Sequence, residues 1–358
     1  MATRHAHIGI RKRERRSRRA LGDWKRRSTG KARRWVVAAR RHRVPIGVGC
    51  AFALVVIVLS ALAWLVPISG PGTFARNQWL IHTIEQEQRP DGLFVFSTQV
   101  TYPPVIAETY FAVVSLHELG VGIPRQAALS TSLTELEVQG DSALAQGNPT
   151  LDSRDLYELL MIHRLAGIPL DMSRFSGYAA AMQKLTETQA PPATLLGLHN
   201  WYYAIQTLHL LGLTSDSVRG AVAREVPSLI HQLSAPSTMV IQIAYVVDAC
   251  AILGIRLTPD ERAVADAQVQ RAWTAQGGFA SAASTPDVMS SFFALVIARE
   301  LGISEVDHVQ AISEWVARLR TWTGYSEAVG LAVDPLGTMY ALALNHLLLD
   351  ANGDTAVR

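Results

Sequence analysis

Cysteine is scarce in this sequence, because only Cys50 and Cys250 occur among its 358 residues. Cys50 lies in a long apolar run and Cys250 in an apolar, helix-like segment, so we expect no disulfide bond within the chain. The sequence also lacks a stretch that alternates apolar and polar residues long enough to indicate a sheet. It therefore predicts neither a disulfide framework nor a β-sheet.

The common phosphate-binding motifs are absent too. There is no Gly-x-Gly-x-x-Gly, no Gly-Lys-Ser/Thr loop and no Asp-Asp-x-x-Asp run. We therefore expect no nucleotide cofactor, and no magnesium site for a diphosphate.

One long apolar segment is present. Ile46 to Val66 comprises 21 residues without a charge, which as a helix would span about 30 Å, the thickness of a bilayer core. Because the nearby positive charge precedes it, we expect residues 1–43 in the cytoplasm and residues 68–358 outside. The sequence thus predicts a retained single-pass anchor over 44–67 in the plasma membrane. A cleaved signal peptide, with Ala61-Leu62-Ala63 as its small-residue pattern, is the alternative.

Basic residues are concentrated in the predicted cytoplasmic tail. Residues 1–43 contain 17 Lys or Arg residues against Glu14 and Asp23, whereas the rest of the chain is acidic. Few apolar residues precede Trp35, which predicts disorder. Beside a membrane span we expect this tail to lie on anionic lipid headgroups rather than to bind nucleic acid.

A single phrase recurs six times in the acidic body, as in "AETYFAVVSLHELGV" and "LHNWYYAIQTLHLLGL". The six copies end at Gly120, Gly167, Gly212, Gly254, Gly302 and Leu349. A period in the forties with a glycine at the helix end is typical of helix-pair repeats. More charged segments with apolar residues at spacings of three and four separate the copies. The sequence predicts an all-α fold of six outer and six inner helices, closed into a ring, with an open solenoid as the alternative.

Tight turns join outer to inner helices in some of the repeats. Gly277-Gly278 precede Phe279 in the fifth repeat, Asp91-Gly92 precede Phe94 in the first, and Gly324-Tyr325 form a looser third case. After the fifth-repeat turn, Thr285-Pro286-Asp287 is predicted to open the inner helix, with Pro286 at its first position.

In the first and fifth repeats, an outer helix is followed by a "QxxDGxF" or "QGGF" turn and an inner helix ending in "LG". This order resembles the repeats of the prenyltransferase and squalene cyclase superfamily. The resemblance covers residues 74–350 and implies an α6/α6 toroid with a ligand cavity along its axis. The family's reactive motifs are not matched. Where the family has a zinc-binding Asp-x-Cys, this chain reads Asp287-Val288-Met289, with methionine in place of the cysteine. The sequence Asp248-Ala249-Cys250 has the right residues but lies deep in its predicted helix. The Asp-x-Asp-Asp run of the cyclases does not occur. We therefore expect no metal.

Aligning the six phrases on their last position reveals a polar column twelve residues earlier. Its members are Glu108, Asp155, Asn200, Gln242, Ser290 and, without a side chain, Gly337. If Pro286 starts its helix, Ser290 lies one turn inside, which favours a polar ring at the mouth of a narrow, apolar cavity suited to an acyl or isoprenoid chain. Capping of helix N-termini is the alternative explanation.

A second polar group occurs in "GLHNWYYAI", where His199, Asn200 and Tyr203 resemble the Asn, His and Tyr that polysaccharide lyases on α/α toroids use to move a proton. With Glu108, Asp155 and Asp287 as catalytic candidates, an enzyme acting on an isoprenoid, a lipid or a glycan stays open. The preferred hypothesis is a membrane-anchored cell-envelope protein whose toroid binds a lipid-like, glycan or protein ligand. Whether the chain is an enzyme is undecided at this point, because no pair of titratable groups is shown to converge.

Overall fold

The computed structural model describes residues 71–96, 105–147, 151–188, 193–281, 285–303 and 306–351. The predicted tail and the predicted span over 44–67 lie outside these ranges. Among the helices within them, none is both long and apolar enough to cross a membrane.

The described residues form twelve α-helices and one short 3-10 helix, with no strand among them, as the sequence predicts. The outer helices are α3 (Pro71–Gln86), α5 (Gln126–Ala145), α7 (Ser176–Thr188), α9 (Asp216–Gln232), α11 (Pro259–Ala272) and α13 (Val306–Leu319). The inner helices are α4 (Val105–Glu118), α6 (Ser153–Leu165), α8 (Leu195–Leu210), α10 (Val240–Ile252), α12 (Val288–Leu301) and α14 (Pro335–Ala351). The 3-10 helix η1 (Met172–Phe175) precedes α7.

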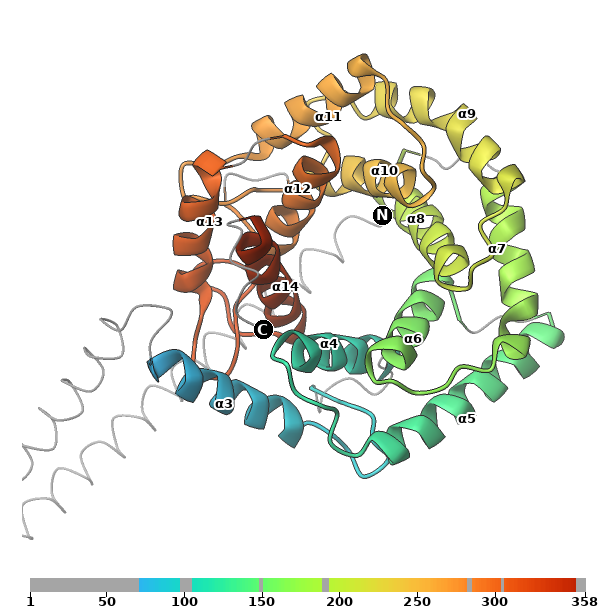
Figure 1. Cartoon of the computed structure of the whole chain (residues 1–358), viewed down its shortest axis with the longest axis vertical. Helices are drawn as coiled ribbons and strands as arrows, with labels where there is room; N and C mark the ends of the chain where they lie inside the picture. The colour runs from blue at the N-terminus through green and yellow to red at the C-terminus, as the bar shows by residue number, and fades with distance from the viewer. Residues whose placement is uncertain are drawn as a thin grey trace, which may run out of the picture. The chain divides into compact units, whose positions relative to one another are not determined.

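The inner helices form a closed ring, which Figure 1 shows surrounded by the outer helices. Each inner helix packs against the next, and α14 packs against α4. At this junction His346 Nδ1 of α14 lies 2.8 Å from Glu118 Oε2 of α4. This contact confirms the predicted closed ring and excludes the open solenoid.

The burial of the two layers follows their sequences. Helix α10 reads "VIQIAYVVDACAI" and buries nine residues, because it lies between its ring neighbours and the outer layer. Helix α11 reads "PDERAVADAQVQRA" and buries only Ala265, Gln268 and Val269. One apolar face is enough for a helix that is covered from the inside only.

The recurring glycines end the inner helices, as predicted. Gly120, Gly167, Gly212, Gly254 and Gly302 all have φ between 63° and 71°, the left-handed region that is open to glycine at little cost. In each case the next residue donates its N–H to a carbonyl five residues back, as Val121 does to Leu116 at 3.0 Å. This bond satisfies an orphan carbonyl of the last helical turn.

The glycine-aromatic turns are one structure used three times. Phe94, Phe279 and Tyr325 each pair with a residue at the end of the preceding outer helix. Their N–H groups donate to hydroxyls of the following inner helix, Thr109 at 3.1 Å, Ser291 at 3.0 Å and Thr338 at 3.0 Å. A Cβ atom on Gly92 would collide with the backbone of Leu129 in α5. Gly277 is likewise close to the carbonyl of Ala311 in α13, so in these two turns the glycine lets the turn dock against an adjacent outer helix.

Candidate functional site

Six aromatic side chains meet inside the ring, one from each inner helix. We call them the aromatic collar: Tyr110 of α4, Tyr157 of α6, Tyr203 of α8, Tyr245 of α10, Phe293 of α12 and Tyr340 of α14. They stand nine or ten residues before the closing position of each phrase. Because the phrases share a register, the six rings reach the same level of the toroid.

The collar rings contact one another in chain order. Their centroids are 6.0 Å apart for Tyr110 and Tyr157, 5.0 Å for Tyr157 and Tyr203, and 6.3 Å for Tyr203 and Tyr245. The series continues with 5.3 Å from Tyr245 to Phe293 and 6.0 Å from Phe293 to Tyr340. These spacings lie in the range of favourable aromatic pairs, and most are tilted or edge-on.

The collar hydroxyls are held in their neutral form. Burial raises the pKa of Tyr157 and of Tyr245 to about 12. It also raises the pKa of Tyr110, Tyr203 and Tyr340 well above the ordinary tyrosine value. A side-chain hydrogen bond joins Tyr110 to Tyr157. The collar therefore offers ring faces and neutral hydroxyls.

Arg154 of α6 brings a positive charge to this level. Its Nε lies 2.7 Å from Glu158 Oε1 one turn later, and its guanidinium carbon lies 5.9 Å from the ring centroid of Phe111 on α4. Although burial dominates the raised pKa of Tyr203, Tyr245 and Tyr340, the charge of Arg154 opposes the rise at all three. The charge of Arg154 therefore reaches tyrosines of α8, α10 and α14.

Glu158 is the least satisfied polar group of this cluster. Its side chain is buried, and its Oε2 atom has no hydrogen-bond partner among the described residues. Burial raises its pKa to about 7, although Arg154 opposes that shift and Asp155 and Asp152 add to it. Near neutral pH this carboxyl can therefore exist with or without a proton.

Hydrogen bonds join Tyr202 and Gln206 of α8 to Asp248 of α10. Tyr202 donates its hydroxyl to Asp248 Oδ2 at 2.7 Å, and Gln206 Nε2 donates to the same oxygen at 3.0 Å. Cys250 is buried, and burial raises the pKa of its thiol to about 12. The Asp-x-Cys pair at Asp248 thus serves packing, and the described residues hold no group of three or more His, Cys, Asp or Glu side chains arranged for a metal.

The predicted polar column lies in the N-terminal turns of the inner helices, and we call its members Glu108, Asp155, Asn200, Gln242 and Ser290 the rim. Glu108 Oε2 accepts from the N–H of Phe96 at 3.1 Å. Asp155 accepts from the N–H of Asp152 in a capping box. Gln242 accepts from the N–H of Met239 at 2.9 Å and donates to the carbonyl of Ala193 at 2.9 Å.

The start of the fifth inner helix differs from the expectation. Helix α12 begins at Val288, not at Pro286, and Asp287 is its N-cap. Asp287 Oδ1 accepts from the N–H of Ser290 at 2.7 Å and Oδ2 from its hydroxyl at 2.8 Å. A carboxylate at this position bonds the free N–H groups of the first turn, which a proline start would leave unbonded. Ser290 is thus the third helical residue and does not lie one turn deeper.

Of the predicted site residues, His199 and Tyr203 are brought together. The His199 ring lies 4.7 Å from that of Tyr203 and 6.0 Å from that of Tyr245. Its Nδ1 is 3.5 Å from Asn200 Oδ1. Burial lowers the pKa of His199 below the ordinary histidine value, which favours the neutral ring. His199 therefore borders the collar from the rim side.

Sequence reasoning missed most of this cluster, namely Tyr110, Tyr157, Tyr245, Phe293, Tyr340, Arg154 and Glu158. A signal for the aromatic residues was available, because each of the six phrases carries Tyr or Phe nine or ten residues before its end. Arg154 and Glu158 occur in the second phrase only, so aligning the repeats would not reveal them.

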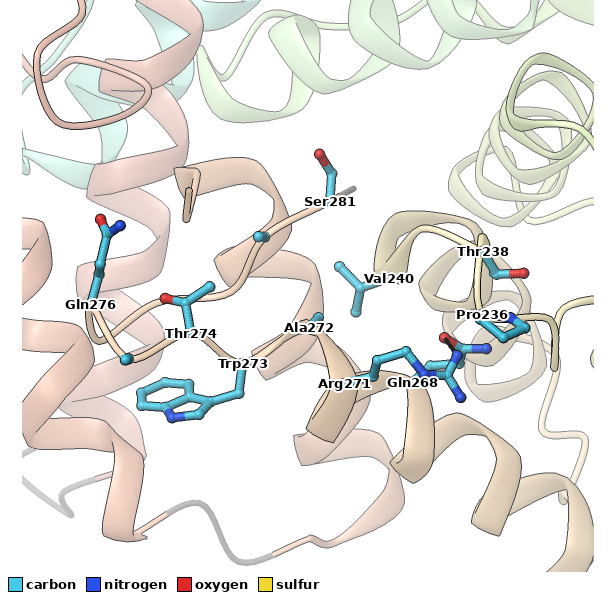
Figure 2. Close-up of a pocket in the computed structure, with 12 residues that line it drawn as sticks. Pro236, Thr238, Val240, Gln268, Arg271, Ala272, Trp273, Thr274, Gln276 and Ser281 are labelled. Carbon is cyan, nitrogen blue, oxygen red and sulfur yellow. Dashed lines mark hydrogen bonds between the residues drawn. The ribbon is translucent and has the colours of Figure 1, made fainter. Parts of the chain in front are cut away.

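A separate pocket of about 460 Å³ lies beside the fifth-repeat turn (Figure 2). Its lining includes Pro236, Thr238, Arg271, Trp273 and Ser281. Its polar groups are engaged in holding the loops, since Gln268 Nε2 donates to the carbonyl of Leu233 at 2.6 Å and Thr274 Oγ1 to that of Gly278 at 2.8 Å. We therefore place the candidate site at the collar.

Comparison with protein families gives a match over most of the chain. The family model described as "Prenyltransferase alpha-alpha toroid domain" matches residues 51–190 and 220–357, which is most of the chain. No curated protein matches the sequence.

Proposed function

The chain belongs to the prenyltransferase alpha-alpha toroid domain family, and from this premise we propose that its toroid is a binding module that holds an apolar chain along the axis of the aromatic collar. The observation that carries the proposal is the collar itself, with one ring from each of six helices at a single level. Large apolar faces that converge on one axis are what a lipid-like ligand requires.

Three residues of the collar keep part of their surface accessible. Tyr110, Tyr157 and Tyr340 are only partly buried, yet the desolvation that raises their pKa requires dense protein around each of them. Accessible surface on rings that are otherwise enclosed by protein supports a hollow at the axis of the collar. Val114, Met161 and Ala343, one turn further along α4, α6 and α14, are also partly buried, so apolar side chains continue beyond the collar.

Extraction of the purified full-length chain with organic solvent, followed by mass spectrometry, tests this function. We expect a bound molecule with an acyl or isoprenoid chain, and its amount should fall in the collar variants Tyr203→Leu and Tyr340→Leu. Tyr178→Leu is the matched control, because Tyr178 is buried in α7 and its hydroxyl donates to the carbonyl of Gly140, away from the collar. A chain that purifies empty and binds no long-chain alcohol contradicts the proposal.

Glu158 favours turnover of the bound molecule as a second candidate function. A buried carboxyl with a pKa of about 7 and an unbonded oxygen can donate or accept a proton near neutral pH. If the chain is an enzyme, wild-type protein and Glu158→Gln should co-purify with molecules of different mass, product and substrate respectively. Identical masses would support binding without turnover.

We also propose that the chain is anchored at the plasma membrane, with the toroid outside the cytoplasm. This proposal rests on the apolar segment over 44–67 and the basic residues before it. Reporter fusions at both ends and the mass of the mature N-terminus test it. A mature chain that begins near Trp64 would identify a cleaved signal peptide instead.

A further inference from the structure

The collar contains an ion pair that its apolar contacts do not need. Arg154 and Glu158 lie one turn apart on α6 and pair at 2.7 Å. Taking a carboxylate out of water is costly, and here one of its two oxygens stays unbonded among the described residues. A pair that only stabilised the fold would gain from a second hydrogen bond. This pair leaves Glu158 incompletely satisfied, beside a cation that lies 5.9 Å from the ring centroid of Phe111 and whose charge acts on the collar tyrosines.

Arg154 is placed to meet a ligand. Its charge acts on rings of α8, α10 and α14, and also on His199. A guanidinium presents a planar set of donors that matches a carboxylate, and only part of this set is used by Glu158. An anionic group in the lumen would therefore find free donors at the collar.

From these contacts, and resting on the proposed function, we propose that Arg154 receives the carboxylate head of a long-chain acid whose tail lies in the aromatic collar, and that Glu158 is the competitor which this head displaces. Displaced from Arg154, Glu158 takes up one proton from solvent, so the number of charges buried at the collar does not increase.

Charge at the collar selects a monoanion. The carboxyl groups of Asp155 and Glu158 on α6 and of its N-cap residue Asp152 interact electrostatically, and Arg154 supplies the positive charge that opposes them. One negative charge on the ligand can replace that of Glu158, whereas a diphosphate would add charges with no partner. We therefore expect the site to prefer a carboxylate over a prenyl diphosphate of equal chain length.

Competition by Glu158 predicts a pH dependence with a definite sign. As pH rises through about 7, Glu158 loses its proton and pairs with Arg154, so affinity for the carboxylate falls. With one linked proton the decrease from pH 6.5 to pH 8 is roughly eightfold.

The titratable and charged groups around the pair are Asp152, Asp155 and Tyr157 on α6, Tyr110 on α4, His199 and Tyr203 on α8, Tyr245 and Asp248 on α10, and Tyr340 on α14.

The experiment compares decanoate, 1-decanol and geranyl diphosphate, three ligands with ten-carbon chains, by calorimetric titration of the full-length chain at pH 6.5 and pH 8. Wild type should bind decanoate most tightly at pH 6.5 and roughly eightfold more weakly at pH 8. Glu158→Gln should bind it equally, within twofold, at both pH values. Glu314→Gln, which removes an exposed carboxylate from α13, should behave as wild type.

The Arg154→Gln variant should bind decanoate no better than 1-decanol, and its binding of 1-decanol reports that it is folded. Equal binding of decanoate and 1-decanol by wild type would overturn the role of Arg154 while leaving the collar as a chain site. Tighter binding of geranyl diphosphate, or a pH dependence that persists in Glu158→Gln, would also overturn the inference. If none of the three ligands binds, the proposed function itself fails.

Discussion

The inner helices carry two levels of conspicuous side chains, the rim and the collar, which are two or three residues apart along each helix and are bonded differently. The bonds of Glu108, Asp155 and Gln242 at the rim go to backbone groups at or before the start of an inner helix. At the collar, Tyr157 and Tyr203 contact rings of adjacent helices. A first-turn polar side chain always has free N–H groups nearby, so its polarity alone says little about a ligand. Side-chain contacts between inner helices are stronger evidence for a ligand site.

Loss of a collar ring should have the largest effect on stability. Tyr203→Ala removes contacts with Tyr157, His199 and Tyr245 and leaves a cavity inside the ring, so we expect a loss of about 3–5 kcal/mol in the free energy of unfolding. Urea denaturation measures it. Asn200→Ala at the rim of the same helix is the control and should cost about 1 kcal/mol or less. Equal losses would remove the distinction between the levels.

The next largest effect should be a pH dependence that separates two carboxyl groups of α6. The pKa of Glu158 at the collar is raised from 4.5 to about 7, so the folded protein binds its proton more tightly than the unfolded chain does. The stability from this group is complete below pH 4.5 and is lost as pH rises through about 7. The loss is on the order of 3 kcal/mol, and urea unfolding between pH 4.5 and pH 8 measures it.

In Glu158→Gln this part of the pH dependence should disappear. Asp155→Asn at the rim is the matched control and should keep most of the slope between pH 4.5 and pH 7, because burial contributes more than Asp155 to the raised pKa of Glu158. Wild type and Glu158→Gln with the same slope would show that Glu158 does not titrate in this range.

Removing a rim cap should have a smaller effect. Asp287→Ala takes away the acceptor for the N–H and the hydroxyl of Ser290, and loss of an N-cap costs about 1–2 kcal/mol. Thermal unfolding measures this loss, and decanoate affinity should stay unchanged. A loss of affinity without a loss of stability would instead assign Asp287 to the ligand site, as one of the catalytic candidates from the sequence.

The smallest effect is expected for Glu108→Gln. Its amide oxygen can still accept from the N–H of Phe96, so stability should change by less than about 0.5 kcal/mol. Ligand affinity should also be unchanged. If affinity falls, Glu108 contacts the ligand and the rim is part of the binding site, as the polar column predicts.

Much of the fold could be predicted from the sequence, because its signals are local and repeated. Gly120 and its four equivalents need a left-handed backbone, and this need marks the helix ends without any knowledge of the tertiary structure. The start of α12 could not be placed, because Pro286 and Asp287 are both good first residues. The choice depends on bonds from Asp287 to Ser281 and Ser290.

The site was less predictable, for a physical reason. Polar residues in apolar helices are conspicuous in a sequence, whereas Tyr157 and Tyr245 are indistinguishable from ordinary core residues. Only the closure of the ring brings these rings to one axis. Arg154 and Glu158 read as a surface pair of the i, i+4 type. Their place beside the collar depends on the orientation of α6 relative to the other inner helices, which no local pattern specifies.

Photo-crosslinking tests most directly whether the collar is the binding site. A ten-carbon carboxylic acid with a diazirine at the end of its chain is bound to the full-length chain at pH 6.5, irradiated, and located by peptide mass spectrometry. We expect labels on the inner helices at and beyond the collar, in the peptides that contain Tyr157, Tyr203 and Tyr340, and competition by unlabelled decanoate. Labels at Trp273 and Arg271, in the pocket of Figure 2, or on outer helices alone, would contradict the account.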